Sequence, residues 1–353
     1  NKIGFLYQYN TQKYTYQLGF GFQPTRLSGY TFNREISTSK ESINFVPNAR
    51  FSYRINQLSS FSLIYKGRNN QPEFYQIQPV RDNSNSQYII IGNPELQSEF
   101  INEFSLQYRN FNMVSGNAFF GNLSFKSIKN KIVTDRTLIP NSTIQETGFT
   151  NTSGYFDTHA YYLYSLSLIE NVFNININST ADYNNNISFI NQEKNKGRIL
   201  NFTQGLQATY ALDDWLNIDF RGNYSLSRIR NSVLAISSAD VSTLSLGLGN
   251  KTYLKDWVVS FDVAKRINNG YSDFKTNPTL LNLYFERAFG KNDRAIVRLQ
   301  AFDILNQNTG ITREIIGNDT YFTQNDRLGR YFLVSFNMRL QKFPNNNESN
   351  NNK

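Results

Sequence analysis

The sequence predicts an all-β protein, and specifically a transmembrane antiparallel β-barrel. Three observations support this fold class. Apolar and polar residues alternate along many segments, 15% of the residues are aromatic although only 39% are apolar, and short connections alternate with long ones. Successive side chains of a strand point to opposite faces, so alternation gives each strand one apolar and one polar wall. In a membrane barrel the apolar wall faces lipid and the polar wall faces a water-filled lumen.

Residues 330–343 show this alternation most clearly and are expected to form the closing strand. The residues expected to face lipid are Phe332, Val334, Phe336, Met338, Leu340 and Phe343. The intervening residues, including Asn337 and Arg339, are mostly polar and are expected to face the lumen, an arrangement that a helix would not preserve. Residues 344–353 are polar and rich in asparagine. We therefore expect residues 1–343 to form barrel strands and loops, and residues 344–353 to form a disordered tail.

About fifteen strands are expected, with different connections at their two ends. The predicted strands are residues 2–9, 14–22, 45–55, 60–66, 98–108, 119–134, 150–168, 172–182, 200–211, 215–229, 241–254, 257–267, 280–289, 294–305 and the closing strand. Short turns join them in pairs, and the expected polar loops are residues 23–42, 67–97, 135–148, 184–196 and 306–326. Short turns lie on the periplasmic side of outer-membrane barrels. This pattern predicts an outer-membrane location with a periplasmic C-terminus.

The odd number of expected strands has a consequence for closure of the barrel. A closed antiparallel barrel normally has an even number of strands, and an open edge in lipid leaves backbone groups unpaired. Either one strand is miscounted, or further strands precede this chain, or the first and last strands close in parallel. Missing N-terminal strands are the preferred explanation. The chain starts within a strand pattern and shows no signal peptide, which fits a mature, truncated or partial sequence.

Aromatic residues gather near the expected short turns, and both tryptophans, Trp215 and Trp257, lie there. Amphipathic rings are enriched at the two boundaries between membrane and water, so these residues are expected to form an aromatic girdle. The alternative is that aromatic residues are simply favoured in strands. The placement of both tryptophans favours the girdle.

Composition limits the classes of function. A net charge of +9 suits contact with the anionic headgroups of outer-membrane lipid and lipopolysaccharide, or attraction of anionic solutes. The basic residues are scattered and accompany no recognition motif, so no nucleic-acid partner is expected. The chain has no cysteine, which excludes disulfides and thiolate metal sites. No apolar run approaches the roughly 18 to 20 residues of a membrane-spanning helix.

Residues that could support catalysis or metal binding do not form a complete constellation. His159 is the only histidine, with Ser153 and Asp157 nearby in the sequence. Residues two positions apart share one strand face, and a triad also needs an oxyanion site, so catalysis is not expected. Residues 82–86 begin like a calcium loop but lack its later glycine and glutamate, so a turn is expected. We predict no enzymatic activity, no cofactor and no metal.

Residues 244–249 alternate between leucine and small residues. Leu244, Leu246 and Leu248 are expected to form a lipid-facing stripe, and Ser245, Gly247 and Gly249 are expected to face the lumen. No helix follows this segment, so its glycines do not indicate a phosphate-binding loop.

Several segments carry a resemblance to a known family. Residues 92–99, GNPELQSE, resemble the GNP-x-L-x-x-E segment of TonB-dependent outer-membrane receptors and of the related outer membrane β-barrel family. Residues 126–134 are similar to the strand that follows this segment, and residues 301–306, AFDILN, resemble the strand end before the last loop. The order and spacing of these segments agree over nearly the whole chain. The motif positions, expected to be structural, are Asn93, Pro94, Glu99, Asp303 and Asn306.

This resemblance implies a 22-stranded barrel with a plugged lumen, of which the chain would supply the C-terminal portion. In Gram-negative receptors of this kind an N-terminal domain forms the plug, and an N-terminal box engages the energy-transducing TonB protein. The resemblance therefore implies N-terminal barrel strands, a plug, TonB and a surface lipoprotein as partners. The implied function is import of a bulky nutrient such as a siderophore, cobalamin, a glycan or a peptide. Neither a plug nor a TonB box is found in this chain.

Two other classes of function stay open. The barrel could be a scaffold or subunit of a larger outer-membrane complex without transport of its own. Loss of the TonB system would then leave uptake unchanged. A soluble all-β binding module would require the apolar stripes to face a dry protein core. Tyr, Asn, Gln and Arg are frequent in residues 68–93 and 306–325, which suits glycan or peptide recognition.

Overall fold

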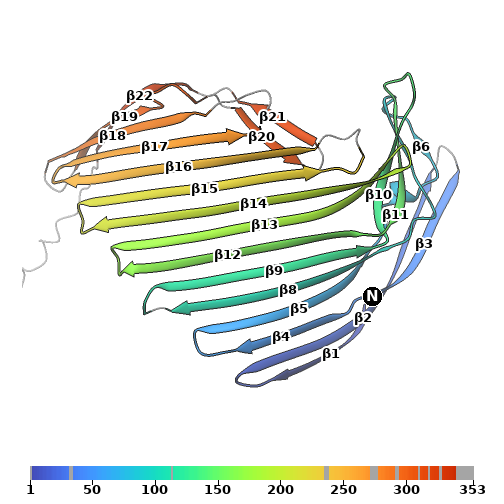
Figure 1. Ribbon diagram of the computed structural model, residues 1–353. Coiled ribbons are helices and arrows are strands. Elements are labelled where there is room, and N and C mark those ends of the chain that lie inside the picture. The colour runs from blue at the N-terminus through green and yellow to red at the C-terminus, as the bar shows by residue number, and fades with distance from the viewer. Residues whose placement is uncertain are drawn as a thin grey trace, which may run out of the picture.

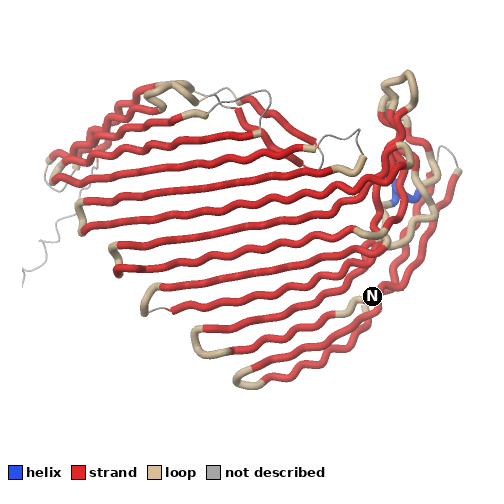
Figure 2. Tube along the Cα trace, in the orientation of Figure 1, coloured by secondary structure: helices blue, strands red, loops and turns tan. Residues whose placement is uncertain are grey.

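The computed structural model describes residues 2–31, 35–112, 114–233, 238–270, 277–290, 294–308, 311–316, 319–325 and 328–338. Within these ranges the chain is almost entirely β-structure, with long strands lying side by side in a curved sheet (Figure 1, Figure 2). The main sheet contains 20 strands, and a separate sheet contains two. None of the helices in the described ranges is long and apolar enough to cross a membrane.

The main sheet is built on a series of antiparallel strands in which each pairs with the one before and the one after. Each segment that the sequence predicted as a strand overlaps one member of this series. The members in order are β1 (Ile3–Asn10), β2 (Tyr14–Thr31), β4 (Asn48–Arg54), β5 (Ser59–Asn70), β8 (Glu99–Asn112), β9 (Asn117–Lys129), β12 (Tyr155–Ile169), β13 (Phe173–Ile190), β14 (Glu193–Leu212), β15 (Leu216–Arg230), β16 (Ala239–Leu254), β17 (Trp257–Asn269), β18 (Thr279–Phe289), β19 (Ala295–Phe302) and β22 (Tyr331–Met338).

Several segments predicted as loops contain regular structure, which corrects the sequence-based expectation. These elements lie at the end of the sheet opposite the short turns (Figure 1). They are β3 (Ile36–Phe45), α1 (Phe74–Ile77), β6 (Arg81–Asp82), β7 (Tyr88–Ile91), β10 (Lys131–Leu138), β11 (Gln145–Thr152), β20 (Ile311–Ile316) and β21 (Asp319–Gln324). β10 and β11 also take the ends of the predicted strands 119–134 and 150–168, each of which is divided into two strands. Backbone pairing does not require an apolar face, so polar strands outside lipid lack the period-two signal that identifies the others.

The connection between β13 and β14 shows this correction most clearly. Residues 184–196 were expected to form a loop, but the two strands stay paired from Asn184 opposite Ile199 to Ile190 opposite Glu193. Only Asn191 and Gln192 form the turn, and both have positive φ, at 50° and 66°. A two-residue turn with two positive φ angles matches the twist of a hairpin and favours asparagine. The polar stretch is therefore a long hairpin.

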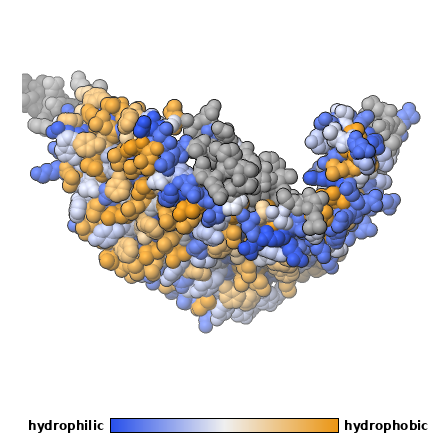
Figure 3. All heavy atoms as spheres, turned by 45° about the horizontal axis from the view of Figure 1, so that its top comes forward, coloured by the Kyte–Doolittle hydropathy of each residue, from blue (hydrophilic) through white to orange (hydrophobic). Residues whose placement is uncertain are grey.

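The sheet has one apolar face, which is exposed. Phe51, Leu63, Leu106 and Leu123 lie directly opposite one another on four successive strands, and such residues share a face. Leu246, Leu248, Leu283, Phe285 and Leu299 continue this face with 39% to 46% of their surface exposed. Figure 3 shows apolar residues gathered over the strands on the visible side. Exposed apolar surface of this extent marks contact with lipid or with protein.

Alternate residues of the closing strand lie on opposite sides of the sheet. Phe332, Val334 and Phe336 lie opposite Ala301, Leu299 and Val297 of β19. Phe332 and Val334 are 72% and 69% exposed, and Met338 is exposed on the same side. The alternate residues Leu333, Ser335 and Asn337 lie opposite Gln300, Arg298 and Ile296 on the other side. Arg339, Leu340, Phe343 and residues 344–353 lie outside the described residues.

The sheet is open at two edges, so the described residues do not form a closed barrel. In these residues β1 pairs only with β2, and β22 pairs only with β19. The sequence predicted a closed barrel, whereas the described residues of this chain form an open curved sheet. A 22-stranded closed barrel stays a prediction, since exposed edges in lipid would leave backbone groups without partners.

The two faces of β19 generate a stability prediction that uses neighbouring residues. In the full-length protein, Leu299→Arg should lower the free energy of unfolding in lipid vesicles by about 2–4 kcal/mol, because a charge at mid-membrane on the lipid face is costly. Gln300→Arg, on the opposite face, should change it by less than about 1 kcal/mol because lumen positions accept polar residues. Denaturant-induced unfolding followed by tryptophan fluorescence measures both. Equal losses from the two variants would contradict the assignment of the faces.

Candidate functional site

The face opposite the apolar one is polar along the length of the sheet, and we call it the polar face. One row of directly opposed residues crosses seven successive strands on this face. The row consists of Asn122, Tyr161, Thr180, Thr203, Ser225, Thr243 and Asn268. Hydroxyl, amide and phenol groups in such a row both donate and accept hydrogen bonds. The polar face is therefore suited to contact with water and can form hydrogen bonds to a polar solute.

Charged residues of the polar face from β9 to β19 are mostly paired. The Lys126 amine lies 2.8 Å from a carboxylate oxygen of Asp157, and the Arg298 guanidinium lies 2.8 Å from a carboxylate oxygen of Glu286. The Tyr284 hydroxyl also donates to Glu286. These side chains are half-buried, and ion pairs at a surface that meets water contribute little stability each. Their main effect here is to leave this part of the wall close to electrically neutral.

Arg221 is a charged side chain of this wall that lies beside small residues and carboxylates. Its guanidinium pairs with Asp262 and lies 3.3 Å from Asp219. Gly247 and Gly249 of the neighbouring strand lie beneath it, and a Cβ at either position would approach Arg221 atoms to within 3.5–3.6 Å. The alternation predicted for residues 244–249 is present, with Leu246 and Leu248 exposed on the apolar face. A Cβ at either glycine would thus only be in ordinary contact with this arginine, which is flanked by two carboxylates.

His159 belongs to a cavity on the polar face rather than to a triad. Its Nδ1 lies 2.6 Å from Asp182 across β12 and β13, whereas Asp157 pairs with Lys126. The backbone oxygen of Ser153 accepts a hydrogen bond from Lys194. The cavity has a volume of about 550 Å³, and both pairs line it. Asp182, on the next strand, carries no sequence signal that would have linked it to His159.

A hydrogen-bonded network surrounds Tyr155 at the same cavity. Its hydroxyl donates to Asp157 over 3.0 Å and accepts a bond from Asn184 over 3.1 Å. The Lys131 amine lies 5.0 Å from the centre of its ring, in the geometry of a cation–π contact. The volume falls in the range of small-molecule sites, roughly 300–1,000 Å³. The exposed mixture of amides, hydroxyls and paired charges suits reversible binding of a polar solute.

Residues 92–99, the first motif, form hydrogen bonds to several strands at the end of the sheet opposite the short turns. Glu99 is only 2% exposed and accepts hydrogen bonds from the Asn70 amide at 2.8 Å and the Ile132 backbone at 2.7 Å. The Asn93 side chain donates to the Phe149 carbonyl and accepts from the Glu95 backbone, both at 2.9 Å. Pro94 is exposed in the same turn. These residues tie together the ends of β5, β10 and β11.

A small apolar core lies behind this motif. Ile77, Leu96 and Phe149 are buried together and come from α1, the motif and β11. Gly92 is also essential to the packing, since a Cβ there would lie 2.0 Å from the Gln78 carbonyl oxygen. The motif thus anchors the short helix and strands that cover the loop end.

The second motif, residues 303–306, forms a compact turn after β19. Asp303 is buried, has φ of 45°, and accepts hydrogen bonds from the backbones of Gln307 at 3.1 Å and Asn308 at 2.9 Å. Asn306 also has positive φ and accepts a bond from the Arg330 backbone at 3.1 Å. Both residue types tolerate this left-handed conformation. The contact with Arg330 links this turn to the start of the closing strand.

Two further sequence features can be located. Asp82 accepts hydrogen bonds from the Ser84 hydroxyl at 2.6 Å and from the Ser84 backbone at 3.0 Å, which is the geometry of a turn. These two hydrogen bonds lower the pKa of the Asp82 carboxyl.

Trp257 lies at the short-turn end with the Arg287 guanidinium 4.4 Å from its ring centre. An aromatic ring beside a cation suits the boundary between membrane and headgroups.

Exposed apolar and polar faces on one antiparallel sheet, with short turns at one end and elaborated loops at the other, define an outer-membrane barrel wall. Comparison with protein families gives the same class. Residues 4–277 match the model of the Outer membrane protein beta-barrel family, and the chain belongs to this family. This membership points to the outer membrane as its location. A search of curated proteins found no match.

The contacts of Glu99 lead to a prediction about the loop end. Glu99→Ala should lower the free energy of unfolding of the full-length protein by about 1–3 kcal/mol, because Asn70 and the Ile132 N–H lose their buried acceptor. Limited proteolysis should cut residues 71–97 faster in this variant. Glu95→Ala is the matched control, since Glu95 is an exposed residue of the same motif. Equal protease resistance of Glu99→Ala and wild type would contradict this assignment.

Proposed function

We propose that this chain is the C-terminal part of the barrel of a TonB-dependent outer-membrane transporter that imports a bulky nutrient. The observation that carries the proposal is the continuous polar face behind an exposed apolar face, with a cavity of about 550 Å³ on the polar side. Resemblance of residues 92–99 and 301–306 to this receptor class adds to it. In this proposal the polar face lines the lumen and contacts the solute during passage.

The remaining parts of the transporter follow from the open edges. Strands that pair with β1 and β22 would complete a wall with no unpaired backbone in lipid. In the proposed protein these are N-terminal barrel strands, which enclose a plug that responds to TonB. A surface lipoprotein over the loop end is a further proposed partner. The short turns then lie in the periplasm, together with the C-terminus, and the chain itself acts as a binding and guiding wall rather than an enzyme.

The chemistry of the polar face favours a polyhydroxylated or amide-rich solute, such as a glycan or a peptide. The seven-residue row and the His159 cavity offer hydroxyls, amides and tyrosine rings. These groups bind sugars and peptide bonds by hydrogen bonding and stacking. The paired charges of this region contribute donors and acceptors without a strong preference for one sign of charge.

Uptake measurements test the proposal. Cells expressing the full-length protein should accumulate at least one member of a labelled panel of oligosaccharides, peptides, siderophore complexes and cobalamin. Deletion of the gene or of the TonB system should each reduce this accumulation to background, because energy for plug displacement is lost. A small sugar that enters through porins serves as control and should be unaffected. Uptake that depends on the gene but not on TonB would support a passive barrel, and no dependent uptake at all would favour a scaffold.

A further inference from the structure

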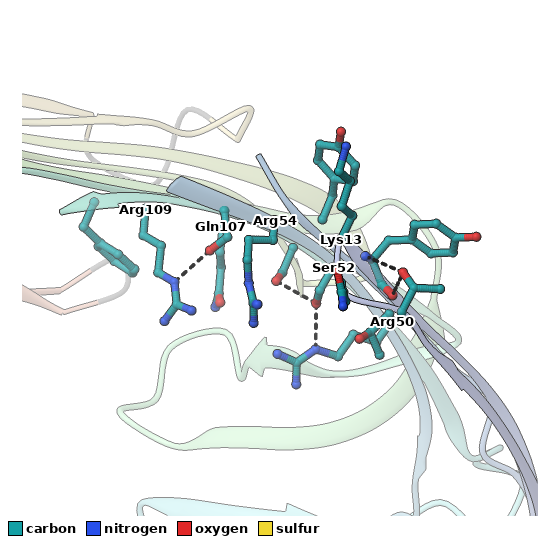
Figure 4. A pocket seen from close by; sticks show the side chains of 14 residues that line it. Lys13, Arg50, Ser52, Arg54, Gln107 and Arg109 are labelled. Atoms are coloured by element: carbon teal, nitrogen blue, oxygen red, sulfur yellow. Dashed lines mark hydrogen bonds between the residues drawn. The ribbon is translucent and has the colours of Figure 1, made fainter. Parts of the chain in front are cut away.

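A second cavity on the polar face differs in charge from the first. It has a volume of about 250 Å³, lies beside the short turn between β1 and β2, and has four cationic side chains in its lining, Lys13, Arg50, Arg54 and Arg109. We call it the basic pocket. Figure 4 shows Arg50, Arg54 and Arg109 extending from the sheet toward the same side. These four residues come from the β1–β2 turn, β4 and β8, and β5, which lies between β4 and β8, contributes Ser60 and Ser62 to the lining.

The register of the strands explains why the pocket is open. Ser60 of β5 lies directly opposite Arg54 of β4 on one side and Arg109 of β8 on the other. Two strand spacings, about 10 Å, therefore separate the backbones of the two arginines. In the next row Ser62 lies between Ser52 and Gln107. Small side chains between long cationic ones leave a hollow that the guanidinium groups can border without filling it.

No carboxylate lines the basic pocket. The Nε atom of Arg50 donates to the Ser52 hydroxyl at 3.3 Å and that of Arg109 to the Ser60 hydroxyl at 2.8 Å, which leaves their terminal nitrogens available. Among the ion pairs of the described residues, none involves these four cations. β4 and β5 contribute no carboxylate to the pocket, because residues 42–72 contain no aspartate and no glutamate.

The contrast with the rest of the wall is informative. From β9 to β19 the basic residues Lys126, Arg221 and Arg298 each lie beside a carboxylate. Arg50, Arg54 and Arg109 carry like charges, and no carboxylate of the lining offsets their mutual repulsion. An anion held between them would remove that repulsion and satisfy the free N–H groups, as guanidinium groups bind oxyanions through two parallel hydrogen bonds.

We propose that the basic pocket is an oxyanion-binding site of the lumen wall that takes a small solute with two or more phosphate or carboxylate groups. A volume of about 250 Å³ admits a compact polyanion and excludes a folded domain. Arg54 and Arg109 would bind separate anionic groups from opposite sides of Ser60, with Lys13 and Arg50 supplying further charge. This inference concerns binding alone and does not rest on TonB-dependent import.

Calorimetry on the purified full-length protein in detergent tests the proposal with two probes, inorganic pyrophosphate and citrate. Each should bind, and affinity should fall as salt is raised, because the contacts are electrostatic. The double variant Arg54→Gln/Arg109→Gln should bind at least about tenfold more weakly, since two charge-assisted contacts are lost. Preference between the probes distinguishes phosphate from carboxylate as the group recognised. Arg54→Lys should bind more tightly than Arg54→Gln but more weakly than wild type, because it retains the charge and loses the paired hydrogen bonds of the guanidinium.

Arg68→Gln is the matched control. Arg68 lies on β5 outside the pocket and pairs with Glu103 at 3.2 Å. Its replacement should leave the affinity for both probes within about twofold of wild type, because a paired arginine outside the pocket does not contact the anion. Resistance to unfolding in sodium dodecyl sulfate on electrophoresis verifies that each variant retains its barrel. Absence of binding to wild type, as would occur if an acidic segment of the same protein neutralises these cations, overturns the proposal. Equal affinity of the folded double variant and wild type overturns it as well.

Discussion

The structure depends on one constraint, which is that backbone N–H and C=O groups in a bilayer must bond to one another. Long strands paired in order along the chain meet this constraint between β1 and β22, and only the outer edges of these two strands lack a partner in the described residues. Once the strands are paired, the pleat fixes which side chains meet lipid and which do not. The faces, the seven-residue polar row and both cavities are consequences of this pairing. A shift of one residue in any register would exchange the faces of that strand.

The same constraint explains which parts of the fold the sequence predicts. Within the expected membrane region each strand must be apolar on one side, so residues 330–338 or 244–249 reveal both the strand and its orientation. Beyond the membrane the backbone can pair with polar residues on both sides. The ends of β13 and β14 nearest their shared turn, residues 184–196, are rich in asparagine and have no period-two signal, so they were expected to form a loop. How the barrel closes could not be predicted either, because closure depends on the strands that would pair with the outer edges of β1 and β22.

Sites on the wall are harder to predict because strand register, rather than spacing along the chain, brings their residues together. Asp182 reaches His159, and Glu286 reaches Arg298, only through the pairing of neighbouring strands. The motif positions Glu99, Asn93 and Asp303 were expected to be structural, and each forms hydrogen bonds that hold turns or strand ends. For the basic pocket the one signal in the sequence was the absence of acidic residues from residues 42–72.

The length of the β13–β14 hairpin affects how the protein can move. At about 3.3 Å per residue, the 20 residues of β14 extend roughly 65 Å, whereas an outer-membrane strand needs only about 9–11 residues to cross the bilayer. About half of this hairpin is thus longer than a bilayer crossing requires and would extend outside the membrane as part of the wall. A flexible lid is not expected from a segment whose two strands stay paired with each other up to the turn. Any opening at this part of the rim would have to come from other loops or from material inside the lumen, with the hairpin acting as a fixed support.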